Sequence, residues 1–211
     1  LWNYPITTVG MVMAPRGLGV VLSVIIVGFL MKYIDSRSLM AFGMLVAAYS
    51  TWLMAHHASN ITPWDIIVLN FIQGVGWSFL FVPLTAATFS TLSPRYMDVA
   101  AGFYGLIGNL GKSMGVSILV GFYVRDVEVN RTELVGNISL FNDSIRHNPL
   151  PNTWGLDSIQ SLSALDAQVS YQASMMAYTN DFRLLTFIIL ACVPLVLLMK
   201  KSQGVQQFKK L

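Results

Sequence analysis

The hexapeptide GNLGKS at residues 108–113 ends in the glycine–lysine–serine triplet that binds phosphate in nucleotide-binding proteins. That motif reads G-x-x-x-x-G-K-[ST] and follows a β-strand, so that successive backbone N–H groups turn toward the phosphates. Here the first glycine of the motif is replaced by Leu106, and the surrounding residues 98–123 are apolar or small nearly throughout. The pattern does not fit a phosphate loop. It places a cation, Lys112, inside an apolar helix.

Arg16 is a second cation deep within an apolar segment. It lies about ten residues from the outer end of its helix, hence about 15 Å down, and Lys112 lies about fourteen residues from the inner end of its own span, also near the middle of the membrane. A charge at mid-membrane costs at least about 2.5–3.5 kcal/mol, so it normally faces a partner or a cavity. Either these cations pair with buried acids, or they line a cavity that moves substrate or protons. The acids of this sequence lie at span ends or in loops, so a mid-membrane acid would have to come from elsewhere.

Uncharged polar residues accompany the two cations. Asn70 and Gln73 lie one turn apart in one apolar segment, and Asn109 lies beside Lys112 in the next. Buried amides either join helices by hydrogen bonds or contact a substrate, and the sequence leaves both roles open. Four glycines near Lys112 predict a helix face that a neighbouring helix can approach closely: Gly105, Gly108, Gly111 and Gly115.

The elements that position these residues are membrane spans. The 211 residues are 55% hydrophobic and only 11% charged, with a mean hydropathy of +0.60, whereas a soluble domain carries roughly 25% charged residues. The fold class is therefore all-α, a polytopic membrane helix bundle. Five segments are long enough, or nearly so, to cross a bilayer, which needs about 20 helical residues: 6–34, 38–56, 64–92, 98–123 and 183–199.

The distribution of basic residues predicts the orientation, because short cytoplasmic loops are enriched in Lys and Arg. One side of the membrane receives Lys32, Arg37, Arg95, Lys200, Lys201, Lys209 and Lys210, whereas the short opposite loop HHASNITP contains neither residue type. The first side is predicted to be cytoplasmic. Residues 182–211 would form the last span followed by a C-terminal tail on this cytoplasmic side. Trp2, Tyr4, Trp64 and Tyr123 at the outer ends, and Tyr33 and Tyr96 at the inner ends, fit an interfacial aromatic belt.

Residues 124–181 form an extracytoplasmic loop in this topology. Within it, 157–178 predicts an amphipathic helix, with Asp157 as N-cap and an apolar stripe at spacings of three and four: Ile159, Leu162, Leu165, Val169, Ala173 and Met176. The helix either forms a lid on the outer span ends or offers a docking surface to a partner. Four N-x-[ST] sequons, at Asn60, Asn130, Asn137 and Asn142, also lie on the outer side.

At the first inner loop, the sequence GFLMKYIDSR places Gly28, Asp35 and Arg37 between two spans. This arrangement resembles a degenerate copy of the signature loop of the major facilitator superfamily. In order along the chain, TTVGMVMAPRGLG, FIQGVGWSFLFVPLTAATFSTLSP, GNLGKSMGVSI and NDFRLLTF resemble the last five spans of its fourteen-helix drug:proton antiporters, of the EmrB/QacA type. The resemblance covers nearly the whole chain.

The resemblance implies a C-terminal part of a protein more than twice as long, in the inner (plasma) membrane of a bacterium. It implies proton-coupled efflux of amphipathic drugs, with drug resistance, by alternating access. Partners would be the lipid bilayer, the N-terminal bundle, substrate and protons, and a periplasmic adaptor protein. Arg16 matches the arginine of the family's A-P-R-G block, and Gln73 the glutamine of the next block. Gly28, Asp35 and Arg37 match the signature loop, a charge latch between bundles. The family has an arginine just before the asparagine of its third block, and this sequence has Gly108 at that position. Lys112 lies one turn further on, on the same face, where it could replace that cation.

The predicted pathway therefore comprises Arg16, Asn70, Gln73, Asn109 and Lys112. No enzyme, cofactor or nucleic-acid partner is expected, because the sequence shows no nucleophile–base arrangement and no metal-ligand cluster around His56, His57 or His147. Two alternatives remain open. One is a non-transporting membrane scaffold or truncated remnant, and the other is a metabolite transporter of the same superfamily, because buried amides and a cation suit anionic solutes.

Overall fold

The computed structural model describes residues 6–57, 62–90, 92–137 and 159–198. Its order of elements is α1 (Ile6–Leu30), α2 (Ser36–His57), α3 (Pro63–Phe89), the short 3-10 helix η1 (Pro94–Tyr96), α4 (Met97–Asn137) and α6 (Ile159–Leu198). Five of these helices are long and apolar enough to cross a membrane, and no strand occurs in the described ranges. These findings confirm the predicted all-α polytopic bundle. Trp2, Tyr4, Asn60, Asn142, residues 157–158 and the tail lysines lie outside the described residues.

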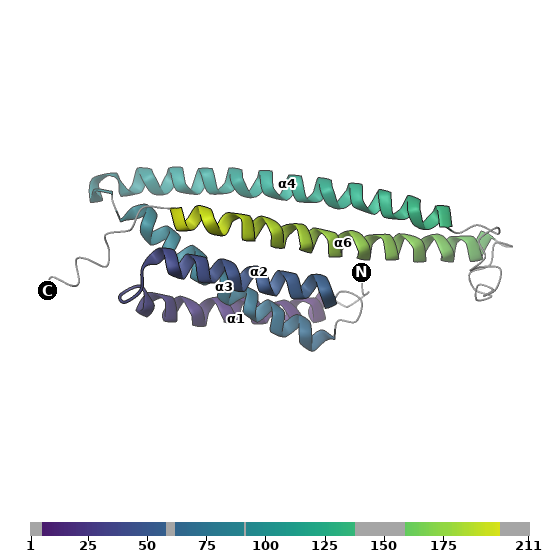
Figure 1. Cartoon of the computed structure of the whole chain (residues 1–211), viewed down its shortest axis with the longest axis horizontal. Coiled ribbons are helices and arrows are strands. Elements are labelled where there is room, and N and C mark those ends of the chain that lie inside the picture. Colours follow the sequence, from purple (N-terminus) through teal and green to yellow (C-terminus); the bar gives the residue numbers. More distant parts are fainter. Residues whose placement is uncertain (1–5, 58–61, 91, 138–158, 199–211) are drawn as a thin grey trace. The chain divides into compact units, whose positions relative to one another are not determined.

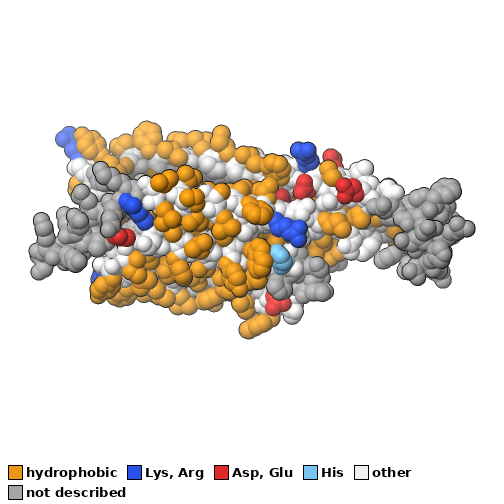
Figure 2. Space-filling model, viewed as in Figure 1, with side chains coloured by type: hydrophobic (Ala, Val, Ile, Leu, Met, Phe, Trp, Pro, Cys, Tyr) orange, Lys and Arg blue, Asp and Glu red, His pale blue; other side chains and the backbone are white. Residues whose placement is uncertain are grey.

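The helices expose many large apolar side chains, and their contacts bury several polar residues beside apolar ones such as Val27, Met40 and Phe79. Many large hydrophobic residues of α1 and α4 face outward, among them Leu18, Phe29 and Phe103, whereas Ser23, Ser50 and Asn70 are buried. Figure 2 shows hydrophobic side chains over a broad band of the visible face. Exposed apolar side chains of this kind are unfavourable in water but are well solvated by lipid tails. The buried polar groups can then join neighbouring helices by hydrogen bonds.

The chain divides into two compact units, 2–113 with 182–211, and 114–181. In the first unit, α3 packs against both α1 and α2, and Figure 1 shows the three helices together. Glycines make the contacts. A Cβ on Gly19 would lie 2.5 Å from the Phe71 carbonyl oxygen, and a Cβ on Gly43 would lie 2.8 Å from that of Gly76. The helix backbones therefore touch at these crossings, as small residues permit in membranes.

Two serine hydroxyls join the same three helices. Ser50 Oγ on α2 donates to the Leu69 carbonyl oxygen on α3, at 2.8 Å. Ser78 Oγ on α3 lies 3.1 Å from the Val20 carbonyl oxygen on α1 and 3.2 Å from the Gly74 carbonyl oxygen on its own helix. The single hydrogen of Ser78 is thus engaged within the bundle.

The glycines near Lys112 have no close neighbour among the described residues, so the predicted close approach of a helix to this face stays a prediction. A Cβ added to Gly105, Gly108, Gly111 or Gly115 would meet nothing within 4 Å. Among the described helices, close approach occurs at Gly19, Gly43, Gly74 and Gly76.

In the second unit, residues 114–137 of α4 run alongside residues 159–181 of α6 (Figure 1). Buried residues recur on α6 at every fourth position, which forms a straight packing row: Ser161, Leu165, Val169, Ala173 and Ala177. Of the predicted stripe, Ile159, Leu162 and Met176 are exposed. Arg131 and Asp166 form an exposed ion pair between the helices, at 2.7 Å.

The helix boundaries in this region differ from the predicted ones. The predicted amphipathic helix 157–178 and the predicted last span 183–199 belong to one continuous helix, α6. Likewise, α4 continues well beyond residue 123, the predicted end of its span. The physical reason is local: the polar segment TNDFR at 179–183 contains no proline or glycine, and neither does the segment from Tyr123 to Val135. Polar residues alone do not end a helix.

Candidate functional site

A cavity of about 480 Å³ opens within the first unit. Its described lining comes from three helices: Arg16, Val20 and Val24 from α1, Trp77, Ser78, Phe81 and Val82 from α3, and Lys112 from α4. The structure thus brings the two cations predicted at mid-membrane to one cavity, although 96 positions separate them in the sequence.

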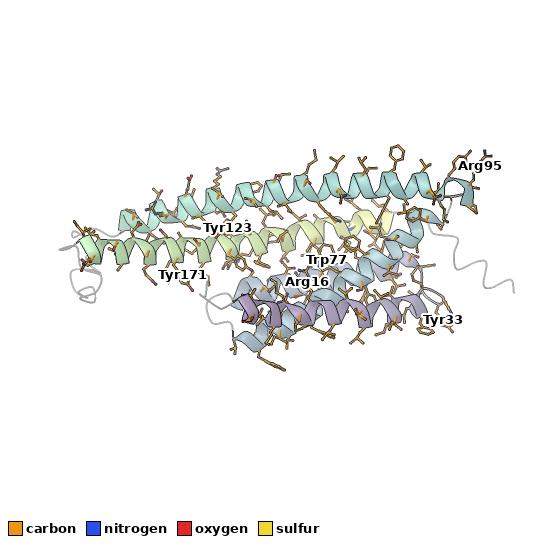
Figure 3. The ribbon with its side chains drawn as sticks, turned by 180° about the vertical axis from the view of Figure 1, so that it is seen from behind. Arg16, Tyr33, Trp77, Arg95, Tyr123 and Tyr171 are labelled. Carbon is orange, nitrogen blue, oxygen red and sulfur yellow. The ribbon has the colours of Figure 1, made fainter. Side chains whose placement is uncertain are left out.

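Arg16 is held in place by its backbone. It follows Pro15, which has no N–H and so leaves the Met11 carbonyl without its usual helical donor. Gly74 of the neighbouring helix α3 packs directly against the Arg16 carbonyl oxygen. Figure 3 shows Arg16 near Trp77, in the space between their helices. The side chain of Arg16 is exposed in this chain, as is that of Lys112.

Both cations are far from the helix ends. Arg16 lies fourteen residues before the end of α1 at Leu30, a distance of about 21 Å at 1.5 Å per residue. Lys112 lies fifteen residues after the start of α4 at Met97, or about 22 Å. These helix ends belong to the predicted cytoplasmic side, where Tyr33 and Arg95 also lie (Figure 3). The two cations therefore reach the cavity at matching depths along their helices.

Two aromatic rings contribute to the apolar part of the cavity lining. Trp77 and Phe81 are one turn apart on α3, and their rings stack with centroids 5.1 Å apart and an interplanar angle of 16°. Val20, Val24 and Val82 add aliphatic surface. The stacked rings therefore contribute apolar surface to the lining of the cavity.

The charges of the cavity have one sign. None of the eight described lining residues is acidic, and two are cations. The other lining residues, apart from Ser78, are aliphatic or aromatic. The cavity thus combines positive potential with a hydrophobic wall.

The three amides of the predicted pathway are not among the described lining residues. Asn70 is 3% exposed, between α3 and its neighbours. Gln73 is half-buried on α3, and Asn109 is exposed on α4. Sequence reasoning missed Trp77, Ser78 and Phe81, although Gln73, Trp77 and Phe81 recur at every fourth position and so share one helix face.

The predicted signature loop lies where α1 ends and α2 begins. Gly28 is exposed, and a Cβ there would meet nothing within 4 Å. The Asp35 carbonyl oxygen accepts hydrogen bonds from the backbone N–H groups of Ser38 and Leu39, at 3.0 and 3.3 Å. Arg37 is half-buried, and its Nε makes no hydrogen bond with the described residues.

Five long apolar helices, with large hydrophobic side chains exposed along them, define a polytopic helical membrane protein. The chain is homologous to the multidrug export proteins EmrB, which confirms the resemblance seen in its sequence. It is 26% identical to EmrB of Haemophilus influenzae over 186 residues, which cover 86% of this chain and 36% of that protein. It is 23% identical to EmrB of Escherichia coli over 211 residues, which cover 97% and 40%. No family model matches the chain.

A third relative is the fatty acid resistance protein FarB of Neisseria gonorrhoeae, which is 21% identical over 94% of this chain and 39% of its own length. The chain therefore spans about two fifths of the length of these relatives. The relatives are bacterial and are named for export or resistance rather than for catalysis. Together with the five helices, they support a multi-pass protein of the bacterial inner membrane.

Proposed function

We propose that this chain is the C-terminal part of a proton-coupled multidrug efflux transporter that exports amphipathic compounds by alternating access. One observation carries the proposal: two cations at matching depths share a cavity with a stacked aromatic pair. Charged residues within membrane spans are usually retained for function, because their burial costs free energy. The names of the relatives, multidrug export protein and fatty acid resistance protein, support the same class of activity.

In this proposal, Arg16 and Lys112 line the substrate pathway directly. Asn70, Gln73 and Asn109 have a secondary role, since they lie on α3 and α4 but are not among the described lining residues. The open face of α4 and the exposed side of α1 would meet the N-terminal bundle of the complete protein.

Proton coupling requires an acid that titrates during the cycle, and none of the described lining residues is acidic. The acids would therefore come from the N-terminal bundle. Gly28, Asp35 and Arg37 would act as the cytoplasmic latch between bundles, with the C-terminus cytoplasmic. The buried Arg37 Nε, which lacks a described hydrogen-bond partner, supports a latch contact with another segment. A periplasmic adaptor protein would bind on the outer side.

The proposal is tested by dye efflux from cells that express the complete transporter containing this chain. Arg16→Ala and Lys112→Ala should each lower efflux at matched membrane abundance, because each removes a charge from the cavity. Lys32→Ala is the control, since Lys32 lies beyond the end of α1 with its Nζ 5.5 Å from the Phe29 ring centroid. Normal efflux by both cavity variants would remove these residues from the mechanism, and a complete wild-type protein that moves no compound would overturn the function.

A further inference from the structure

Tyr104 joins α4 to the end of α3 on the predicted cytoplasmic side. Its ring packs edge-on against the ring of Phe89, with centroids 5.6 Å apart and an interplanar angle of 61°. Its hydroxyl lies 3.5 Å from Thr85 Oγ1, one turn before Phe89 on α3. Edge-to-face packing is a favoured arrangement of two aromatic rings. The side chain of Tyr104 therefore has both an apolar and a polar partner on the same helix.

The direction of the hydroxyl contact follows from the second bond of Thr85. Thr85 Oγ1 donates its hydrogen to the Phe81 carbonyl oxygen, at 2.8 Å. A threonine hydroxyl has a single hydrogen, so Tyr104 is the donor and Thr85 the acceptor in the longer contact. Phe81 lines the cavity and stacks on Trp77. Two consecutive hydrogen bonds thus connect the α4 tyrosine to the aromatic wall of the cavity.

The neighbouring residues of α4 make few contacts with the described helices. Between positions 97 and 113, Ala100 and Tyr104 are half-buried and the other residues are exposed. A Cβ on Gly105, Gly108 or Gly111 would meet nothing within 4 Å. Tyr104 is therefore the large side chain through which this part of α4 packs against the described residues.

We infer that Tyr104 is a positioning residue for Lys112, because its contacts with Phe89 and Thr85 fix the depth and rotation of α4 beside the cavity. Lys112 lies eight residues after Tyr104 on the same helix, about 12 Å away at 1.5 Å per residue. The backbone hydrogen bonds of the helix make this segment stiff. A rotation of α4 at Tyr104 therefore also moves the Lys112 ammonium.

The surroundings of Lys112 give its backbone position more weight. No described residue forms an ion pair with Lys112, and the described cavity lining contains no acid. The ammonium is therefore placed by the helix that carries it rather than by a partner at its head. The inference rests on the proposed function, in which Lys112 lines the substrate pathway, and it adds a residue outside the cavity lining.

The first test measures the position of α4 directly and needs no transport. Nitroxide labels are attached at Leu45→Cys on α2 and Ile107→Cys on α4, where both native side chains are exposed. Cys192 and any other native cysteine are replaced, and the complete transporter is studied in lipid nanodiscs by pulsed electron paramagnetic resonance. Tyr104→Ala should shift or broaden the distance distribution between the labels. An unchanged distribution would overturn the inference.

Two variants make this measurement specific. Tyr104→Phe keeps the ring that packs on Phe89 and should leave the main distance in place. Phe103→Ala removes a ring of similar size from the next position, which is exposed, and should not change the distribution. An equal shift in Phe103→Ala would show a general effect of losing a ring and would contradict the role of Tyr104. Thermal melting establishes that each variant is folded.

The second test is a double-mutant cycle on efflux at matched membrane abundance. The dye is the one of ethidium, rhodamine 6G and fluorescein that the wild-type protein exports fastest. Tyr104→Ala should lower efflux about two- to tenfold, the factor that corresponds to one aromatic pair. In a protein that already carries Lys112→Ala it should cost little more, because a residue that acts through another loses its effect when the other is removed. Multiplication of the two losses would overturn the inference.

The two tests separate this inference from the proposed function. A complete wild-type protein that exports no dye would overturn the function, whereas a label distance altered by Tyr104→Ala alone would still support the positioning role. Normal export by the wild type, with an unaltered label distance in Tyr104→Ala, would leave the function standing and overturn the positioning role.

Discussion

Gly74 on α3 lies directly against the backbone carbonyl oxygen of Arg16 on α1, at a distance that leaves no room for a methyl group. The side chain that supplies a charge to the cavity is therefore fixed by a contact of its own backbone with a neighbouring helix. Any side chain at position 74 must push α1 away from α3 and move Arg16 with it.

Gly74→Ala is predicted to destabilise the bundle by about 1–3 kcal/mol, the usual range for overpacking a tight contact. Thermal melting of the purified protein in detergent measures this effect. Gly10→Ala is the matched control on α1, because a Cβ there meets nothing within 4 Å; it should be neutral or slightly stabilising, since Ala favours helix more than Gly does. Equal melting of both variants would contradict the close contact.

Ser50→Ala is predicted to lower stability by about 0.6–1.7 kcal/mol, the range measured for hydrogen bonds between membrane helices. The change removes the bond from Ser50 Oγ to the Leu69 carbonyl oxygen, which joins α2 to α3. Thr51→Val provides the comparison, since Thr51 Oγ1 donates within its own helix to the Ala47 carbonyl oxygen. A larger loss for Thr51→Val than for Ser50→Ala, measured by urea unfolding in mixed micelles, would refute the prediction.

Trp77→Leu is predicted to lower dye efflux by the complete transporter about three- to tenfold at matched membrane abundance, because Trp77 lines the cavity and an aromatic pair is worth about 0.5–1.5 kcal/mol. Trp52→Leu is the control: Trp52 is on α2, outside the cavity, where it packs on His56. Unchanged efflux after Trp77→Leu would remove this ring from the substrate pathway.

Ala173→Leu is predicted to separate the helices of the second unit, at about 1–3 kcal/mol for a side chain forced into a filled site. Ala173 is 0% exposed in the row that packs α6 against its neighbour. Gln172→Leu adds the same side chain at an exposed position and should have little effect. Hydrogen–deuterium exchange of residues 159–181 distinguishes the two variants, because only the first should increase exchange.

Part of this structure follows from the sequence alone. The apolar segments predicted five helices because their lengths match the membrane, and Arg16 and Lys112 stood out because a charge is costly at that depth. Their presence in one cavity depends on how α1 and α4 are arranged, which no local pattern contains. The glycine face of α4 stays a prediction for the same reason: small residues permit close approach, but a local pattern does not say which helix approaches, and among the described residues Gly74 has a close neighbour while Gly108 has none.

Trp77 and Phe81 were missed because aromatic residues within an apolar span carry no local signal that separates them from ordinary lipid-facing residues. The continuity of α6 was missed because the polar segment at 179–183 resembled a loop in composition. The polarity of a segment indicates whether it prefers water or lipid. Whether a helix continues through the segment depends on helix-breaking residues such as Pro and Gly, and residues 179–183 contain neither.

The glycine contacts that join α1, α2 and α3 also limit how these helices can move relative to one another. Where two backbones touch, no flexible side chain remains to readjust, so one helix cannot slide past another without losing contact. In the proposed transport cycle, these three helices should therefore move as one rigid block. The proposed passage for a solute should then widen along the margin of that block, where Lys112 lies on α4, whose described glycines make no such contact.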